Sequence, residues 1–168
     1  MQALRQALDD KLLPLDELLA NVERRRAAGA TVVFTNGCFD VLHLGHVSSI
    51  QHCRRFGDVV VVGLNSDASV RRQDKGPDRP IWEQATRALM LASLECVDFV
   101  VLFDDDTPIG LLERIRPDVL VKGSDWAADV KGRELVESYG GRIELAPLLD
   151  QQNTTMLIDH IRSKGPRR

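Results

Sequence analysis

Five short aliphatic runs recur along the chain, and none alternates cleanly between apolar and polar residues. They are TVVFTN (31–36), DVVVVGLN (58–65), VDFVVLF (97–103), DVLVKG (118–123) and RIELAP (142–147). A strand that is apolar on both faces belongs in a parallel sheet covered on both sides by helices, because an antiparallel sheet with one wet face shows a period of two. The runs therefore predict a five-stranded parallel sheet.

Segments with helical spacing lie between these runs. Residues 45–56 and 83–95 carry apolar side chains at intervals of three and four, and Thr107 with Pro108 indicates a helix start that continues to about Arg116. Strand and helix thus alternate, as they do in right-handed βαβ units. The expected fold is α/β, a Rossmann-like doubly wound sheet, with ligands bound beyond the carboxyl ends of its strands.

The length of 168 residues fits a single domain with one core. Residues 1–28 are expected to form one or two helices packed outside the sheet. The stretch RRQDKGPDRP (71–80) is too polar and broken for a regular element, which predicts a mobile loop over the site, and the last residues are expected to fray.

Composition excludes several classes of protein. The longest apolar run, residues 59–64, is far shorter than the roughly 20 residues of a membrane span, and the N-terminus does not resemble a secretory signal. Three cysteines without a CxxC pair indicate free thiols and a cytoplasmic protein. A net charge of -3 and 5% aromatic residues disfavour nucleic acid as a partner.

The segment TNGCFDVLHLGH (35–46) joins the first predicted strand to the first predicted helix. Backbone N–H groups at a helix start are unpaired, and the helix dipole favours an anion there. Gly45 permits close approach, and the flanking His43 and His46 can donate hydrogen bonds to phosphoryl oxygens. The segment therefore predicts a phosphate site in the first βα turn.

Other interpretations of this segment stay open at this point. A histidine near a helix start is more often a surface or capping residue. A zinc site is a second alternative, although the spacing of its candidate ligands fits no zinc template; they are Cys38, His43, His46, His52 and Cys53. The chain has no GxxxxGK[ST] and no GxGxxG after the first strand, which disfavours P-loop enzymes and dinucleotide oxidoreductases.

The same segment resembles the signature of the HxGH nucleotidyltransferase, or cytidylyltransferase-like, superfamily. Its members join a nucleoside triphosphate to a small phosphorylated molecule and release pyrophosphate. The blocks LVKGSDW, SYGG and the later TT resemble those of the bacterial D-glycero-β-D-manno-heptose 1-phosphate adenylyltransferases. The similarity covers about residues 30–163, which the resemblance identifies as the catalytic core of a single nucleotidyltransferase domain.

The resemblance implies three groups of site residues. Catalytic roles fall to His43, His46, Lys75 and Lys122. Nucleotide contacts fall to Gly37, Cys38, Phe39, Gly45, Asn65, Asp67, Arg87, Gly123, Asp125, Thr154 and Thr155. Sugar-phosphate contacts fall to Asn36, Asp40 and Arg79. ATP is the implied co-substrate, with Mg²⁺ and no metal held by the protein itself. The oligomeric state stays open, with a homodimer as one option because relatives often form dimers.

Several of these residues have structural alternatives. Asn and Asp suit turns in any case, Asp67 and Thr154 suit helix caps, and Arg87 could be a charge on a helix surface. Relatives usually carry a serine at Asn153 and an acidic residue at Thr86. These departures loosen the assignment of base and sugar and leave the activity class unchanged. Two further hypotheses stay open, a CTP-dependent enzyme acting on glycerol 3-phosphate or a related alcohol phosphate, and a nucleotide-binding module without turnover.

Overall fold

The centre of the protein is a sheet of five parallel strands in the order β3-β2-β1-β4-β5. The computed structural model describes residues 6, 8–73, 76, 78–147, 149 and 154–164. Its strands are β1 (Val32–Gly37), β2 (Val59–Asn65), β3 (Phe99–Phe103), β4 (Val119–Gly123) and β5 (Arg142–Ala146). Each strand lies within one of the five aliphatic runs or overshoots it by a single residue, which confirms the predicted parallel sheet.

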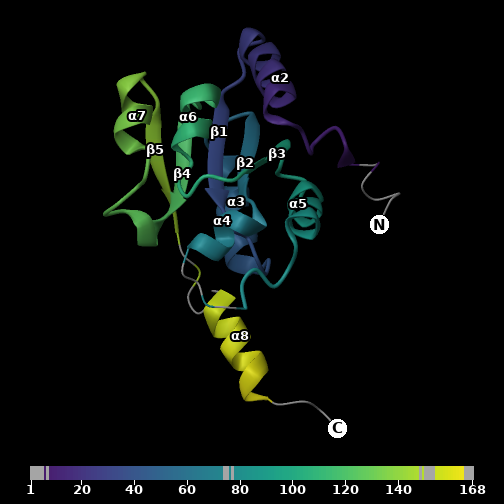
Figure 1. Ribbon diagram of the computed structural model, residues 1–168. Helices are drawn as coiled ribbons and strands as arrows, with labels where there is room; N and C mark the ends of the chain where they lie inside the picture. Colours follow the sequence, from purple (N-terminus) through teal and green to yellow (C-terminus); the bar gives the residue numbers. More distant parts are fainter. Residues whose placement is uncertain are drawn as a thin grey trace.

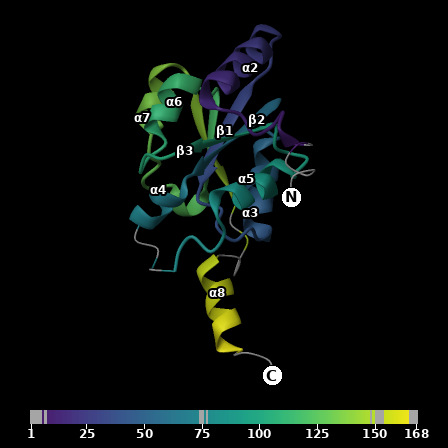
Figure 2. The same ribbon diagram turned by 45° about the vertical axis from the view of Figure 1, so that its right-hand side comes forward.

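Helices cover both faces of this sheet (Figures 1 and 2). One face packs against α3 (Leu44–Cys53) and α5 (Gln84–Ala92). The other packs against α2 (Leu15–Ala27), α6 (Ile109–Ile115) and α7 (Arg133–Ser138). Both views show α8 (Thr154–Ser163) extending away from the sheet. In the described part of the chain, no helix is long and apolar enough to cross a membrane.

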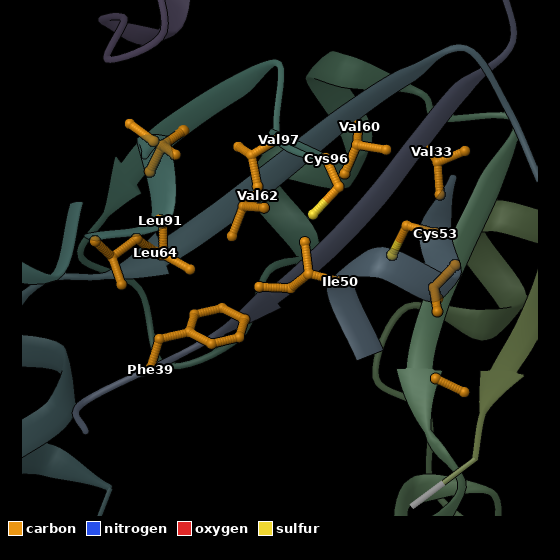
Figure 3. Packing of buried hydrophobic residues seen from close by; sticks show 14 of the residues in the cluster. Val33, Phe39, Ile50, Cys53, Val60, Val62, Leu64, Leu91, Cys96 and Val97 are labelled. Carbon is orange, nitrogen blue, oxygen red and sulfur yellow. The ribbon is translucent and has the colours of Figure 1, made fainter. Parts of the chain in front are cut away.

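Two apolar clusters result, one on each face. Val33, Val60 and Val62 belong to the cluster under α3 and α5, part of which is shown in Figure 3. Their neighbours Val32 and Val61 belong to the cluster under α2, α6 and α7. Because successive side chains of a strand point to opposite faces, a strand buried on both faces must be apolar at every position. This explains the unbroken valine runs.

Aspartates at the amino ends of three strands accept a backbone hydrogen bond from the neighbouring strand. The N–H of Thr31 donates to Asp58 (2.9 Å), that of Val60 to Asp98 (2.7 Å) and that of Val32 to Asp118 (2.7 Å). Each bond satisfies a backbone N–H group that lies just before the part of its strand that pairs with the neighbouring strand. These carboxylates therefore help to set the register in which β1, β2, β3 and β4 pair.

The N-terminal segment corrects one expectation. α2 packs outside the sheet as predicted, but Leu12 forms a parallel bridge with Val100 on the free edge of β3. The Lys11 side chain donates to the carbonyl oxygens of Val97 (2.7 Å) and Leu94 (3.3 Å), beyond the end of α5. Residues 11–13 therefore extend the sheet at its edge, and the apolar pattern of leucines gave no sign of this short pairing.

The helix boundaries bring further corrections. Thr107 does not cap α6, which begins at Ile109 with Pro108 at the N-cap position. The helix α4 (Asp67–Arg72) includes the first two residues of the predicted loop 71–80. α7 and the 3₁₀ helix η1 (Ser124–Trp126) were not predicted, because six and three residues are too few for a periodic pattern to show.

Gly63→Ala is expected to destabilise the sheet. A Cβ at Gly63 would lie 2.7 Å from Cζ of Phe34 and 3.2 Å from Cβ of Asn36, both on β1. Overpacking of this kind costs about 1–3 kcal/mol, so thermal unfolding should show a midpoint several degrees lower. Gly110→Ala is the matched control: its Cβ would meet nothing closer than 3.5 Å, and alanine favours the helix α6. Equal midpoints for Gly63→Ala and the wild type would contradict the prediction.

Candidate active site

The candidate site lies where the strand order reverses. From β1 the chain proceeds to β2 on one side, whereas β4 is the neighbour of β1 on the other side. In open α/β sheets such a switch point forms a crevice beyond the carboxyl ends of the strands. Across it the Lys122 ammonium group, at the end of β4, donates to Oδ1 of Asn36 on β1 (2.6 Å). The structure thus brings these two predicted site residues together.

The turn after β1 is anchored by Phe39. This residue adopts a left-handed backbone conformation (φ 45°), and its ring is buried in the cluster beside Ile50 and Leu64 (Figure 3). The ring also lies over Gly37, where a Cβ would approach its Cε2 to 3.2 Å. Gly37 therefore lets the turn close over the ring. Phe39 was predicted to contact nucleotide, but it lies in the core and holds the turn in place.

Two stacked imidazoles stand at the start of α3. The rings of His43 and His46 have centroids 3.7 Å apart and an interplanar angle of 24°, and the rings of Phe39 and His46 form a T-shaped pair with centroids 5.2 Å apart. His43 occupies the N-cap position without capping the helix through its side chain. Its Nδ1 is buried and has no hydrogen-bond partner among the described residues. Gly45 lies between the two histidines in the first turn of the helix.

Burial lowers the pKa of His43 from its ordinary value of 6.5, so this imidazole is neutral at pH 7. A neutral imidazole donates one hydrogen bond. The unpaired N–H groups of the first turn of α3 add further donors. The arrangement suits an anion such as a phosphate.

Asp40 and Arg79, both predicted to contact the sugar phosphate, bind each other in this structure. The Asp40 carboxylate is 1% exposed. One oxygen accepts from the backbone N–H groups of Ile81 (2.7 Å) and Trp82 (3.0 Å), and the other pairs with the Arg79 guanidinium. Because both oxygens of Asp40 are occupied, it ties residues 79–82 to the turn and presents no oxygen to a ligand.

Arg87 is the largest fully buried side chain among the described residues. Its guanidinium donates to the carbonyl oxygens of Cys38 (2.5 Å), Asn65 (2.9 Å) and Trp82 (2.9 Å), and to the Asp67 carboxylate (2.7 Å). The alternative of a helix surface charge is wrong. A direct phosphate contact is unsupported as well, because the group is enclosed and already engaged; Arg87 joins the ends of β1 and β2 to α4.

Two further residues that were predicted to contact nucleotide, Asn65 and Cys38, are also buried and bonded to other protein groups. Asn65 is 2% exposed, and its amide donates to Oγ of Ser69 (2.9 Å). The buried Cys38 thiol donates to Oε1 of Gln73 (3.1 Å). The helix cap of α4 is Ser66, whose hydroxyl accepts from the N–H of Ser69 (3.0 Å). Asp67, for which capping was the alternative role, pairs with Arg87 instead.

At the end of β4, Gly123 leads into η1, where Asp125 is exposed. The next residue, Trp126, is half exposed, and Nζ of Lys122 lies 5.8 Å from its ring centroid. Trp126 was not among the predicted site residues, although it follows the end of β4 by only three residues.

Three predicted site residues remain, Thr154, Thr155 and Lys75, and the structure describes them only in part. Thr154 is the first residue of α8 and Thr155 the second, but the side chain of Thr155 is outside the described part, as is Lys75 altogether. In the described ranges, no three His, Cys, Asp or Glu side chains gather closely enough to hold a metal ion. The candidate zinc ligands are thus not assembled, and burial raises the pKa of the Cys53 thiol to about 12.

Comparison with known proteins agrees with this geometry. Residues 34–159 match the family model described as cytidylyltransferase-like. The chain is 55% identical over 156 residues to the bifunctional protein HldE of Geotalea uraniireducens, covering 92% of this chain and 32% of that protein. It is also 55% identical over 159 residues to the HldE of Syntrophotalea carbinolica, with 94% and 30% covered. The chain spans about a third of the length of these relatives.

Solved structures share the fold. The lipopolysaccharide core biosynthesis protein from Thermoplasma volcanium superposes with a TM-score of 0.60 at 24% identity, over 72% of this chain and 98% of that one. Pantothenate synthetase from Thermus thermophilus gives a TM-score of 0.62 at 15% identity, over 93% and 71%. With the matched family model, the HldE similarity and the histidine pair at the switch point, the chain belongs to the cytidylyltransferase-like family, the HxGH nucleotidyltransferases.

Proposed function

We propose that this chain transfers AMP from ATP to D-glycero-β-D-manno-heptose 1-phosphate, giving ADP-heptose and pyrophosphate. The observation that carries the proposal is the stacked pair of His43 and His46 at the start of α3, the helix that follows β1 at the switch point where Lys122 bonds to Asn36. Family membership supports nucleotidyl transfer, and the similarity to proteins named HldE supports the heptose substrate.

In this reaction the side chains need only position the substrates and stabilise the charge of the transition state. A sugar 1-phosphate is already an ionised nucleophile at pH 7, so no residue must remove a proton or form a covalent intermediate. A phosphate oxygen of the sugar attacks the α-phosphorus of ATP in line, the new P–O bond forms, and the bond to the β-phosphate breaks as pyrophosphate leaves. His43, His46 and Lys122 stabilise the charge that develops on the equatorial and leaving oxygens.

Magnesium enters this proposal with the triphosphate. Mg²⁺ is usually bound through one or two carboxylates together with substrate phosphates and water. Asp40 is paired with Arg79 and Asp67 with Arg87, whereas Asp125, two residues beyond the end of β4, is exposed. The described residues thus fit a phosphate-held Mg²⁺, which would neutralise part of the triphosphate charge, better than a metal held by the protein.

The direct test is pyrophosphate release by the purified protein with magnesium. ATP and CTP are each paired with D-glycero-β-D-manno-heptose 1-phosphate and with glycerol 3-phosphate. Release with ATP and the heptose phosphate alone is the expected result. Release only with CTP would support the proposed mechanism but contradict the proposed substrates. Absence of release in every pairing would favour a nucleotide-binding module without turnover.

His46→Ala is expected to lower turnover by a factor of about 10² to 10³, the usual effect of removing one preorganised donor to a transition state. The fold should persist, because His46 lies in the first turn of α3, whereas the apolar anchors of that helix are Ile50 and Cys53. His52→Ala, at the other end of the same helix, is the matched control and should keep near wild-type turnover. Near-normal turnover of His46→Ala would refute the assigned role.

The His43 imidazole is expected to take up a proton when ATP binds. Its pKa is lowered by burial in the free protein, and a bound triphosphate favours the imidazolium and raises that pKa. Between the two values the complex holds a proton that the free protein lacks, so ATP affinity increases as the pH falls through this interval.

Calorimetric titration of ATP at pH 6.5, in two buffers of different ionisation enthalpy, measures this uptake. The wild type should take up more protons per ATP than His43→Gln, which lacks the titrating ring. Equal uptake by the two proteins would rule out His43 as the site of protonation.

A further inference from the structure

Trp126 occupies an unusual place for a large aromatic side chain. It ends η1, three residues beyond the last residue of β4, and the side chain is 50% exposed. Lys122, which bridges to Asn36 across the switch point, has its ammonium group 5.8 Å from the indole centroid. The indole therefore stands at the edge of the candidate site, within reach of the same crevice.

The neighbouring cation gives this indole a defined setting. A lysine ammonium within about 6 Å of an aromatic ring is attracted to the face of that ring. Trp126 is not part of either apolar cluster, so packing in the core does not account for it. An exposed aromatic surface beside a phosphate-binding lysine has the character of a platform for a flat ligand.

The fold indicates which part of the ligand reaches it. The triphosphate belongs at the start of α3, after β1, where His43 and His46 lie. Trp126 follows β4, which lies on the side of β1 opposite to β2 and β3. Lys122, which is proposed to meet the phosphates of ATP, lies beside this indole. The base that is joined to those phosphates through the ribose is therefore assigned to the side of Trp126, and the sugar phosphate to the β2 side.

Resting on the proposed function, we propose that Trp126 is the stacking platform for the adenine base of the bound nucleotide. The base lies against the exposed indole while Lys122 holds the adjacent phosphates. Stacking on an aromatic side chain is sequence-tolerant, because every base has a π-face. Trp126 therefore contributes affinity for a nucleoside, and the choice between adenine and cytosine rests on other groups.

The chain offers a direct probe of this contact because it has two tryptophans, Trp82 and Trp126. In a Trp82→Phe background the fluorescence reports on Trp126 alone. ATP and ADP are expected to quench it saturably, since both carry the base. Inorganic tripolyphosphate and D-glycero-β-D-manno-heptose 1-phosphate are expected to leave it unchanged.

Kinetics in the same background provide the second readout. Trp126→Ala should raise the KM for ATP roughly tenfold, in line with the loss of one base–aromatic stack, with a far smaller change in kcat and in the KM for the sugar phosphate. Trp126→Phe should restore most of the affinity, because phenylalanine keeps a stacking face. A purely structural role would not separate these parameters or be rescued in this way.

The outcomes separate this inference from the proposed function. Absence of quenching by ATP, equal quenching by tripolyphosphate, or quenching only by the sugar phosphate would each overturn base stacking, even if pyrophosphate release with ATP is normal. Quenching by ATP and ADP without any pyrophosphate release would support the platform and refute the proposed reaction.

Discussion

The guanidinium of Arg87 holds together the carboxyl end of the sheet. It supplies hydrogen bonds to carbonyl oxygens after β1 and at the end of β2, and its charge is balanced by Asp67. A buried charge is tolerated only when it is paired and its donors are satisfied, and removing one partner leaves an uncompensated charge. The position of the turn that carries the histidines therefore depends on α5, the helix that delivers Arg87.

A second buried pair, Asp40 with Arg79, does the same for residues 79–82. These two pairs thus belong to buried polar networks whose members satisfy one another, whereas the candidate ligand-binding groups lie on α3 and at the end of β4. Such a division gives a preorganised site, because the donors are held by neighbours that need not rearrange during the reaction.

The sequence allowed the sheet and its parallel direction to be predicted, because strands that are buried on both faces leave a local signal in unbroken apolar runs. It did not allow the roles of Asp40, Arg79 and Arg87 to be predicted. Asp40 and Arg79 are 39 residues apart, and Arg87 lies 49 residues from its partner Cys38. A charge near a motif looks the same in the sequence whether it faces a ligand or a distant partner, and only the tertiary fold distinguishes the two.

The bond between Lys122 and Asn36 joins residues 86 positions apart. Contacts of such separation require closure of a long loop, and loop-closure entropy makes them slow to form. A partly folded chain in which β1, β2 and β3 have paired would already carry both histidines but would lack Lys122. Only the chain that has docked β4 against β1 then holds both halves of the crevice, so a ligand that spans the crevice selects the fully folded chain and stabilises it by mass action.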